Sequence, residues 1–524
     1  MGEKLTRKVS IFNEVIGPVM RGPSSSHTAA SYHIGSLVRN LLDNEPAVVD
    51  IIFTKNGSYA AVYHQQGSDR GFATGLLGWK ITDDRFLKAL KESEKAHIKI
   101  NFRVEALVKD DHPNAIEILG ESRSGCKLTI LARSIGGGAI ELRKLNDWPI
   151  HLMGDAYDVL IELRRMTKGA VVELLSKDVE NLEPPSVQSS GDRMLIHFKA
   201  SHPLKEGMVN RLRSLPGIIN VWMTSPVFFP QSGEPLFTSG KEMVDLAEKN
   251  NCTLGAVALS YEAKLLGISE DEASKEMFRR YEIMREAMIK GLDRNLKGMQ
   301  LLQPSAGSII EAERTGRTAI GGIHTRAAAR ALSVMHVDCA MGVVCAAPTG
   351  GSAGTIPGVI TTLAEEKNLT EEQIVLAMFA ASTIGLILAI KGTFAAEVAG
   401  CQVEIGAAGA ISAAAVIEVA GGTAQQACDA AAISFQNTMG SVCDLVQGMV
   451  EIPCHTRNAV AASSAFVCAD LILGGYINPI PLDETIDAVM SVGNMLPPEL
   501  RCTALGGLAI TPSALAMKPK PIAD

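Results

Sequence analysis

The spacing of hydrophobic and polar positions changes twice along the chain. Up to about residue 148, short β-branched apolar runs at residues 48–54 and 126–132 alternate with charged segments such as residues 86–96. Such runs predict strands and the charged segment predicts a short helix, which is an α/β (α+β) pattern. From about residue 240 onward nearly every segment has helical spacing, and no strand pattern intrudes. We therefore expect an N-terminal α/β (α+β) domain at 1–148 and a C-terminal all-α domain at 231–524.

The intervening region, residues 149–230, has a third pattern. Residues 158–163, 194–199 and 218–223 have the character of strands, and residues 208–215 that of a helix. A helix followed by a short edge strand in so small a unit fits a ferredoxin-like module. The sequence therefore predicts three regions in the order α/β, ferredoxin-like, all-α.

Charge and hydropathy narrow the functional class. The chain has 524 residues, with 49 Lys and Arg against 57 Asp and Glu, a net charge of −8. This balance argues against a nucleic-acid or anionic-membrane surface and favours a small-molecule substrate. The longest apolar run, residues 374–390, predicts a buried core helix, and no secretory signal opens the chain. We expect a cytoplasmic protein with no nucleic-acid or membrane partner, and the large apolar helices predict a homodimer.

Eight of the ten cysteines lie between Cys339 and Cys502. A reducing cytosol disfavours disulfides, which leaves core packing or metal ligation. Cys401, Cys443 and Cys454 each stand beside small or turn-forming residues, and no short C-x-x-C pair is present. The fold would have to assemble any metal site from such distant positions, so the spacing leaves packing and ligation both open.

A second group of polar residues, at 22–28 with the sequence Gly-Pro-Ser-Ser-Ser-His-Thr, directly precedes an apolar stripe of helical spacing. Free N–H groups at a helix start, with several hydroxyls, predict a carboxylate or phosphate site, and His27 adds a titratable group. An ordinary helix cap is the alternative, but it accounts for one hydroxyl rather than three and an imidazole.

These motifs resemble those of the iron–sulfur-dependent L-serine dehydratases, which eliminate water without pyridoxal phosphate. Residues 22–28 and 133–138 resemble the β domain of that family, and residues 340–354, 400–406, 450–459 and 504–509 resemble its α domain. The resemblance covers nearly the whole chain in the order β domain, ACT-like segment, α domain.

The resemblance implies a [4Fe-4S] cluster held by Cys401, Cys443 and Cys454, with one iron lacking a protein ligand and with no pyridoxal phosphate. An open iron could act as a Lewis acid on the β-hydroxyl of a substrate. The resemblance also implies that His27 is catalytic and that the substrate carboxylate is held nearby. The residues implied for substrate binding are Ser24, Ser25, Ser26, Thr28, Thr349, Gly350 and Gly351.

The sequence departs from the family at positions close to the chemistry. The family usually has Gly-His-Gly-Thr-Asp in its β domain, whereas residues 65–69 here place Gln66 at the histidine position. A glutamine cannot exchange a proton at neutral pH, so His64 becomes a second candidate acid/base beside His27, unless it is only a surface histidine. Residues 335–338 read Met-His-Val-Asp where Met-Glu-x-Asn is usual, and the chain does not end in the cysteine that some members carry.

We therefore expect conversion of L-serine to pyruvate and ammonia by α,β-elimination. Two alternatives stay open. The same fold and cluster could act on threonine, cysteine or another small β-substituted acid. The site could also have decayed into an amino-acid sensor, which the intact cysteine and Ser-His motifs oppose.

Overall fold

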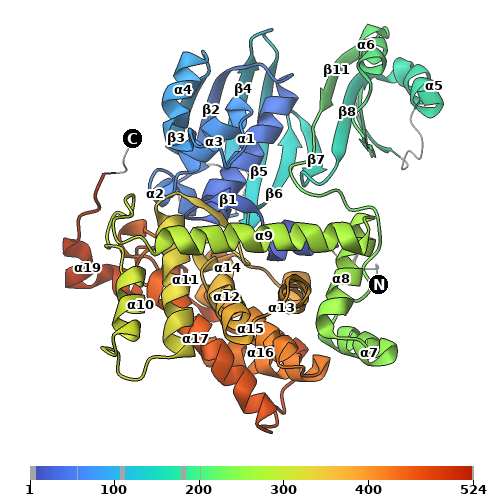
Figure 1. The fold of residues 1–524 in the computed structure, drawn as a ribbon. Helices are drawn as coiled ribbons and strands as arrows, with labels where there is room; N and C mark the ends of the chain where they lie inside the picture. The colour runs from blue at the N-terminus through green and yellow to red at the C-terminus, as the bar shows by residue number, and fades with distance from the viewer. Residues whose placement is uncertain (1–7, 56, 107–111, 179–184, 201, 522–524) are drawn as a thin grey trace.

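The computed structural model describes residues 8–55, 57–106, 112–178, 185–200 and 202–521. Two sheets form the upper part of the molecule in Figure 1, and a body of helices forms the lower part. The long helix α9 (Glu270–Gly291) runs along the boundary between them.

The first sheet has six strands in the order β3-β2-β4-β5-β6-β7. Only the β2–β3 pair is parallel, and the other neighbours are antiparallel. The predicted strands at 48–54 and 126–132 are confirmed as β2 and β5, and the charged segment at 86–96 forms a short 3-10 turn followed by α4. The elements are α1 (Ala30–Leu41), β2 (Pro46–Thr54), α2 (Ser58–Val62), α3 (Ser68–Leu77), α4 (Ala89–Lys95), β3 (Lys99–Glu105), β4 (Ala115–Ser122), β5 (Lys127–Gly136), β6 (Ala139–Leu145) and β7 (Trp148–Leu152).

The second sheet has four antiparallel strands in the order β11-β8-β10-β9. Along the chain the elements alternate as β-α-β-β-α-β, the split arrangement of ferredoxin-like modules. The three predicted strands and the predicted helix of this region are all present. The elements are β8 (Tyr157–Arg164), α5 (Lys168–Asp178), β9 (Ser186–Ser190), β10 (Arg193–Ala200), α6 (Glu206–Ser214) and β11 (Ile218–Met223).

The C-terminal region is helical, as predicted. Its helices are α7 (Gly240–Asn250), α8 (Leu254–Leu266), α9, α10 (Ala306–Arg314), α11 (Ile323–Cys339), α12 (Thr355–Lys367), α13 (Glu371–Lys391), α14 (Ala396–Ala399), α15 (Ile405–Val419), α16 (Ala424–Thr438), α17 (Cys454–Leu473), α18 (Leu482–Met495) and α19 (Pro512–Ala516). Three short strands were not predicted, because two or three residues are too few to show a period of two: β12 (Val343–Cys345), β13 (Cys443–Asp444) and β14 (Arg501–Thr503).

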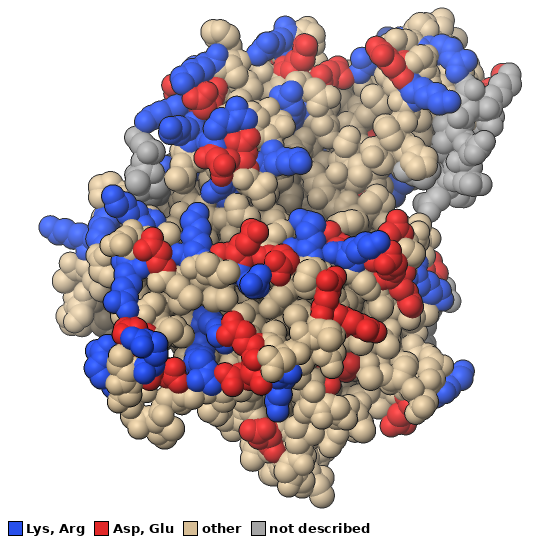
Figure 2. Space-filling view, viewed as in Figure 1, with Lys and Arg blue, Asp and Glu red and all other residues tan. Residues whose placement is uncertain are grey.

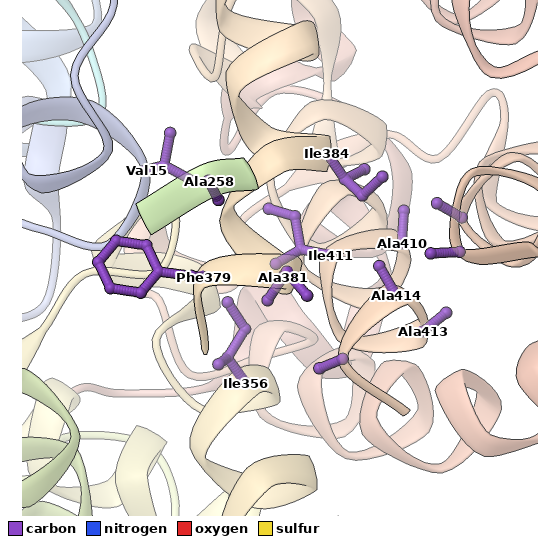
Figure 3. Packing of buried hydrophobic residues seen from close by; sticks show 14 of the residues in the cluster. Val15, Ala258, Ile356, Phe379, Ala381, Ile384, Ala410, Ile411, Ala413 and Ala414 are labelled. Atoms are coloured by element: carbon purple, nitrogen blue, oxygen red, sulfur yellow. The ribbon is translucent and has the colours of Figure 1, made fainter. Parts of the chain in front are cut away.

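Helix α13 lies in the centre of this helical body. Figure 3 shows Phe379 of α13 on the side of Val15 and of Ala258 in α8, and Ile384 of α13 on the side of Ile411 and Ala410 of α15. Two segments, Glu371–Lys391 and Cys401–Val419, are long and apolar enough to cross a membrane, yet 83% of each apolar window is buried in protein. The long apolar run is therefore a core helix, as predicted.

The first described residues of the chain also belong to this helical core. Residues 9–16, including the π-turn Ile11–Val15, pack with α8, α9 and α13 rather than on the first sheet. The buried carboxylate of Glu262 accepts hydrogen bonds from the Ser10 hydroxyl (2.5 Å) and from the Ile11 and Phe12 amides (2.8 and 3.0 Å). Local pattern does not reveal this placement, because the partners are some 250 residues away.

The segment then leaves the core as strand β1 (Val19–Arg21), which pairs antiparallel with β12 of the helical body. This pairing joins the two halves and positions residues 22–28 at their junction. On the face shown in Figure 2, acidic and basic side chains are interspersed. Some of the charged side chains of α9 form ion pairs with one another, as Lys275 and Asp271 do.

Candidate active site

Residues 22–28, called the serine-rich loop below, lie directly before α1. Ser25–Ala29 form a π-turn, and the polar side chains of the loop are buried. The Ser24 hydroxyl accepts the backbone N–H of His27 at 3.2 Å, as a helix cap does. The Nδ1 atom of His27 lies 3.2 Å from Ser24 Oγ and 3.1 Å from Ser26 Oγ. Its Nε2 atom lies 3.0 Å from Ser58 Oγ at the start of α2. Both ring nitrogens therefore have hydroxyl neighbours, and the loop does more than cap a helix.

Glu397 of α14 brings a carboxylate from the helical body to this loop. The Ser26 hydroxyl donates to Glu397 Oε1 at 2.6 Å, and the same oxygen lies 3.7 Å from His27 Nδ1. Burial lowers the pKa of His27, and the Glu397 charge opposes that shift only in part. The imidazole is therefore neutral at pH 7 and able to accept a proton.

A second loop, Gly350–Ser352, meets the first from the opposite side. A Cβ atom on Gly350 would lie 3.0 Å from both the Pro23 carbonyl oxygen and the Ser25 nitrogen, so this close approach of two backbones requires glycine. Asn458 of α17 donates to the Gly351 carbonyl at 2.8 Å and fixes the loop. The predicted substrate loop at residues 349–351 therefore does lie against the serine-rich loop.

Glu404, the N-cap residue of α15, connects that loop to the cysteines. Its carboxyl group is hydrogen-bonded to the Thr349 side chain, and burial together with the Glu397 charge raises the pKa of Glu404 to about 8. A carboxyl oxygen of Glu404 and the sulfurs of Cys401 and Cys443 all lie within 4.8 Å of one another. A mostly protonated carboxyl group thus stands between the two loops and the thiols.

The three predicted cysteine ligands come from separate segments but share one buried cluster. Cys401 begins a 3-10 turn, Cys443 begins β13, and Cys454 begins α17. The Cys401 thiol is hydrogen-bonded to Cys443, and this bond with burial holds the pKa of Cys401 well above its usual range. Arg457 places a guanidinium nitrogen 3.5 Å from the Cys401 sulfur and pairs with Asp444 at 2.9 Å.

This donor set fits a soft-metal cluster. The thiols sit in an apolar shell that includes Met299, Met335 and Val450, and a cation stands beside them to offset thiolate charge. A metal centre is what makes buried thiols ionise, because burial alone keeps them protonated. The buried cysteine-rich site is compatible with an iron–sulfur cluster.

Gln66 and Asp338, two positions that depart from the family pattern, are both buried. Gln66 is 1% exposed, its Nε2 donates to the Gly448 carbonyl of the helical body (3.2 Å), and its backbone oxygen accepts from Thr28 (2.6 Å). Asp338 is buried beneath the loop start, where a Cβ on Gly22 would lie 2.2 Å from its Oδ1. Burial raises the pKa of Asp338 well above its usual range.

His64 is not brought to this junction by any contact among the described residues. Its side chain is 57% exposed and its Nδ1 lies 2.7 Å from Asp69 Oδ2, a hydrogen bond that raises the pKa of His64. The serine-rich loop, the Gly350–Ser352 loop and the three cysteines converge at this junction, whereas the exposed His64 side chain pairs with Asp69.

Sequence reasoning missed Ser58 and Glu397 as neighbours of His27. Neither stands in a motif, and each comes from an element that only the fold brings to the loop. Glu404 and Asn458 did carry a signal, because both fall inside segments that resemble the dehydratase α domain.

The comparisons with known proteins agree with this geometry. The family model "Serine dehydratase alpha chain" matches residues 239–509. The "Probable L-serine dehydratase, alpha chain" of Bacillus subtilis is 35% identical over 285 residues, covering 54% of this chain and 95% of that protein. The "L-serine dehydratase, alpha chain" of Peptoniphilus asaccharolyticus is 33% identical over 275 residues, covering 52% and 94%. The "Probable L-serine dehydratase, beta chain" of B. subtilis is 34% identical over 216 residues, covering 40% and 96%.

Proposed function

Because this chain belongs to the serine dehydratase family, with the alpha and beta parts fused in one polypeptide, we propose that it converts L-serine to pyruvate and ammonia. The protein is a lyase. Loss of water from L-serine gives 2-aminoacrylate, which tautomerises to the imine, and water then hydrolyses the imine to pyruvate and ammonia. The free amino acid has a weakly acidic Cα–H, so the site must supply a base and must orient the carboxylate.

The observation that carries the proposal is that His27, Ser26 and Glu397 lie at the same buried junction as the cluster of cysteine thiols. Glu404 lies beside Cys401 and Cys443, and the charge of Glu397 acts on it. In the proposed mechanism neutral His27 takes the Cα proton, and Glu397 stabilises the imidazolium that forms. The hydroxyls of the serine-rich loop, at the start of the π-turn that leads into α1, hold the substrate carboxylate, for which the helix dipole is favourable.

Cys401, Cys443 and Cys454 would hold the iron–sulfur cluster, and Arg457 would balance its charge. When bound, the cluster supplies a Lewis acid for the departing β-hydroxyl. Glu404 lies beside Cys401 and Cys443 and is hydrogen-bonded to Thr349. These two side chains would therefore stand next to the departing oxygen.

The first test is anaerobic purification with iron and sulfide analysis, followed by an assay of pyruvate from L-serine. We expect iron and serine turnover in the native protein, and loss of both in Cys454→Ala. Cys126→Ala, in the first sheet region, is the matched control and should retain both. Iron-free protein that still turns over serine would overturn the cluster assignment. Iron-loaded protein that does not turn over serine would contradict L-serine as the substrate.

A second substrate is favoured by one observation, the replacement of the family histidine by Gln66. Its Oε1 is buried without a hydrogen-bond partner among the described residues, so a substrate with a different donor could use it. Ammonia release from L-threonine and L-cysteine in the same assay decides this. A kcat/KM for either that exceeds the value for L-serine would move the assignment to that substrate.

We further propose that residues 149–230 form an ACT-like regulatory module. Its β-α-β-β-α-β order supports this, and Leu160, Leu195 and Trp222 pack in the core of the first sheet, which gives a route from module to site. Equilibrium dialysis of the full chain against amino acids tests it, and absence of binding outside the active site would contradict it. We also propose that the protein is a cytoplasmic homodimer.

A further inference from the structure

A fourth thiol, Cys502, lies beside the three that the resemblance singles out. It occupies β14, which runs parallel to β13 with Cys443 opposite Arg501 and Asp444 opposite Thr503. Cys502 is therefore the extra residue of a bulge in this short pairing. Bulges turn a side chain away from the regular strand direction and are common beside active sites.

The backbone of Cys502 has the left-handed φ of 59°, which is uncommon for a residue other than glycine, asparagine or aspartate. A cysteine held in this conformation is over-determined by its surroundings, and such positions cluster at functional sites. The combination of bulge and positive φ points the side chain inward, where it packs on the buried cysteine cluster.

The sulfur contacts of Cys502 are with the predicted ligands. Its thiol is hydrogen-bonded to the Cys443 thiol, which is hydrogen-bonded in turn to Cys401. Three sulfurs thus form a continuous chain, and Cys454 lies in the same cluster. Soft metals select groups of thiolates over any other protein donors.

Cys502 also lies on a strand that contacts the elements around His27. Strand β14 contacts α14, which carries Glu397, and α2, which begins with Ser58. The charges of Glu397 and Glu404 both act on the Cys502 thiol. Cys502 therefore lies on the strand that contacts the helices carrying Glu397 and Ser58, both of which are neighbours of His27.

We propose that Cys502 is a fourth thiolate donor to the metal cluster, so that this chain covers the iron that three cysteines leave open. The inference rests on the proposed function. On loading, the Cys502 S–H bond breaks, its proton leaves to solvent and a sulfur–iron bond forms, with no change of oxidation state. Substrate binding must reverse this exchange, which makes Cys502 a gate on the reactive position.

The test is Mössbauer spectroscopy of the holoenzyme reconstituted with ⁵⁷Fe, without substrate. We expect all iron in the wild type to have sulfur-only coordination, from sulfide and one cysteine thiolate, and about a quarter of the iron signal in Cys502→Ser to shift to an oxygen- or nitrogen-ligated site. Cys252→Ser, in the loop between α7 and α8, is the matched control and should give the wild-type spectrum. A wild-type spectrum that already contains the shifted quarter, unchanged in Cys502→Ser, would overturn the proposal.

A second measurement does not depend on the variant folding as the wild type does. Adding L-serine to the wild-type holoenzyme should convert about a quarter of the iron signal to the shifted site. An unshifted spectrum in an enzyme that turns over serine would overturn the gating role. Pyruvate formation by the same sample separates this result from failure of the proposed function, since a protein without turnover would contradict the dehydratase assignment itself.

Discussion

At the scale of single residues, the proposed acid–base chemistry rests on His27, which burial keeps neutral, and on the Glu397 carboxylate, which the helical body brings to it. Glu397 raises the pKa of His27 against the larger effect of desolvation. The size of this effect on the pKa of His27 depends on the distance from His27 Nδ1 to Glu397 Oε1, and the hydrogen bond from Ser26 holds that oxygen in place.

Replacing Glu397 with glutamine should keep the hydrogen bond from Ser26 and remove the charge. We expect kcat to fall on the order of 100-fold, since the imidazolium loses its partner. The acidic limb of the kcat/KM profile should move to lower pH, because the pKa of His27 falls when Glu397 no longer raises it. Glu372→Gln, at the exposed start of α13, is the control. A profile that does not move would assign Glu397 a merely structural role.

Burial also acts on a histidine outside the site. His33 of α1 lies 2.9 Å from the Gly138 carbonyl through Nδ1, and desolvation lowers the pKa of His33 to about 4. An unfolded chain binds a proton there at about pH 6.5, so the unfolded state binds more protons between pH 6.5 and 4. His33 therefore contributes stability that is lost as the pH falls through this window.

His33→Gln should remove that dependence. Between pH 7 and pH 5 the wild type should lose about 2 kcal/mol that the variant does not lose. Melting temperatures of both proteins at the two pH values measure this difference. Equal losses in wild type and variant would show that His33 is protonated in the folded protein.

At the scale of elements, the junction depends on a backbone contact between the first sheet and α14. Gly136, at the end of β5, has a φ of 99°, and a Cβ on it would lie 2.8 Å from the Cβ and 2.9 Å from the nitrogen of Ala395, directly before α14. Anything larger than glycine pushes α14, and with it Glu397, away from the serine-rich loop.

Gly136→Ala should thus cost more activity than stability. The matched control is Gly125→Ala, whose φ of 86° imposes a similar backbone strain while nothing lies within 4 Å of the added carbon. We expect serine turnover to fall at least about tenfold in Gly136→Ala, the effect of a small misplacement of catalytic groups, and to stay near wild type in Gly125→Ala. Equal activities would show that this contact does not position Glu397.

Elements with strong local patterns could be predicted from the sequence, and elements without them could not. Strands β2 and β8 are runs of apolar residues buried against a helix, which leave a clear signal. Strand β9, at the edge of its sheet, is Ser-Val-Gln-Ser-Ser and mostly exposed, so its pairing with β10 has no counterpart in hydropathy.

The same distinction holds for the site. The serine-rich loop and the cysteine segments carry chemistry in consecutive residues, whereas Ser58, Glu397 and Cys502 enter through tertiary contacts alone. A bulge or a domain contact follows from packing between distant segments, which residue spacing does not encode.

At the scale of the whole molecule, one helix leaves an apolar face uncovered. Val460, Val467 and Leu471 of α17 are 66%, 47% and 44% exposed and fall at i, i+7 and i+11, on one side of the helix. The chain continues with exposed Tyr476 and Ile477. Contiguous exposed apolar surface of this kind marks an interface, and the expected homodimer would cover it.

Val467→Lys should weaken that dimer. Light scattering coupled to size-exclusion chromatography should give twice the chain mass for the wild type and a shift toward the monomer for the variant. Ile289→Lys, at an exposed apolar position of α9, is the control and should leave the mass unchanged. A monomeric wild type would contradict the prediction.

The early segment that completes the helical core has a consequence for synthesis of the protein. Residues 9–16 leave the ribosome before either sheet, but their partners, Glu262 and α13, follow only after both sheets have been made. Until then the apolar side chains of Ile11 and Phe12 have no core to enter and are exposed to chaperones or to aggregation. The sheets can therefore fold as they emerge, whereas the helical body must wait until translation has supplied the helices that enclose residues 9–16.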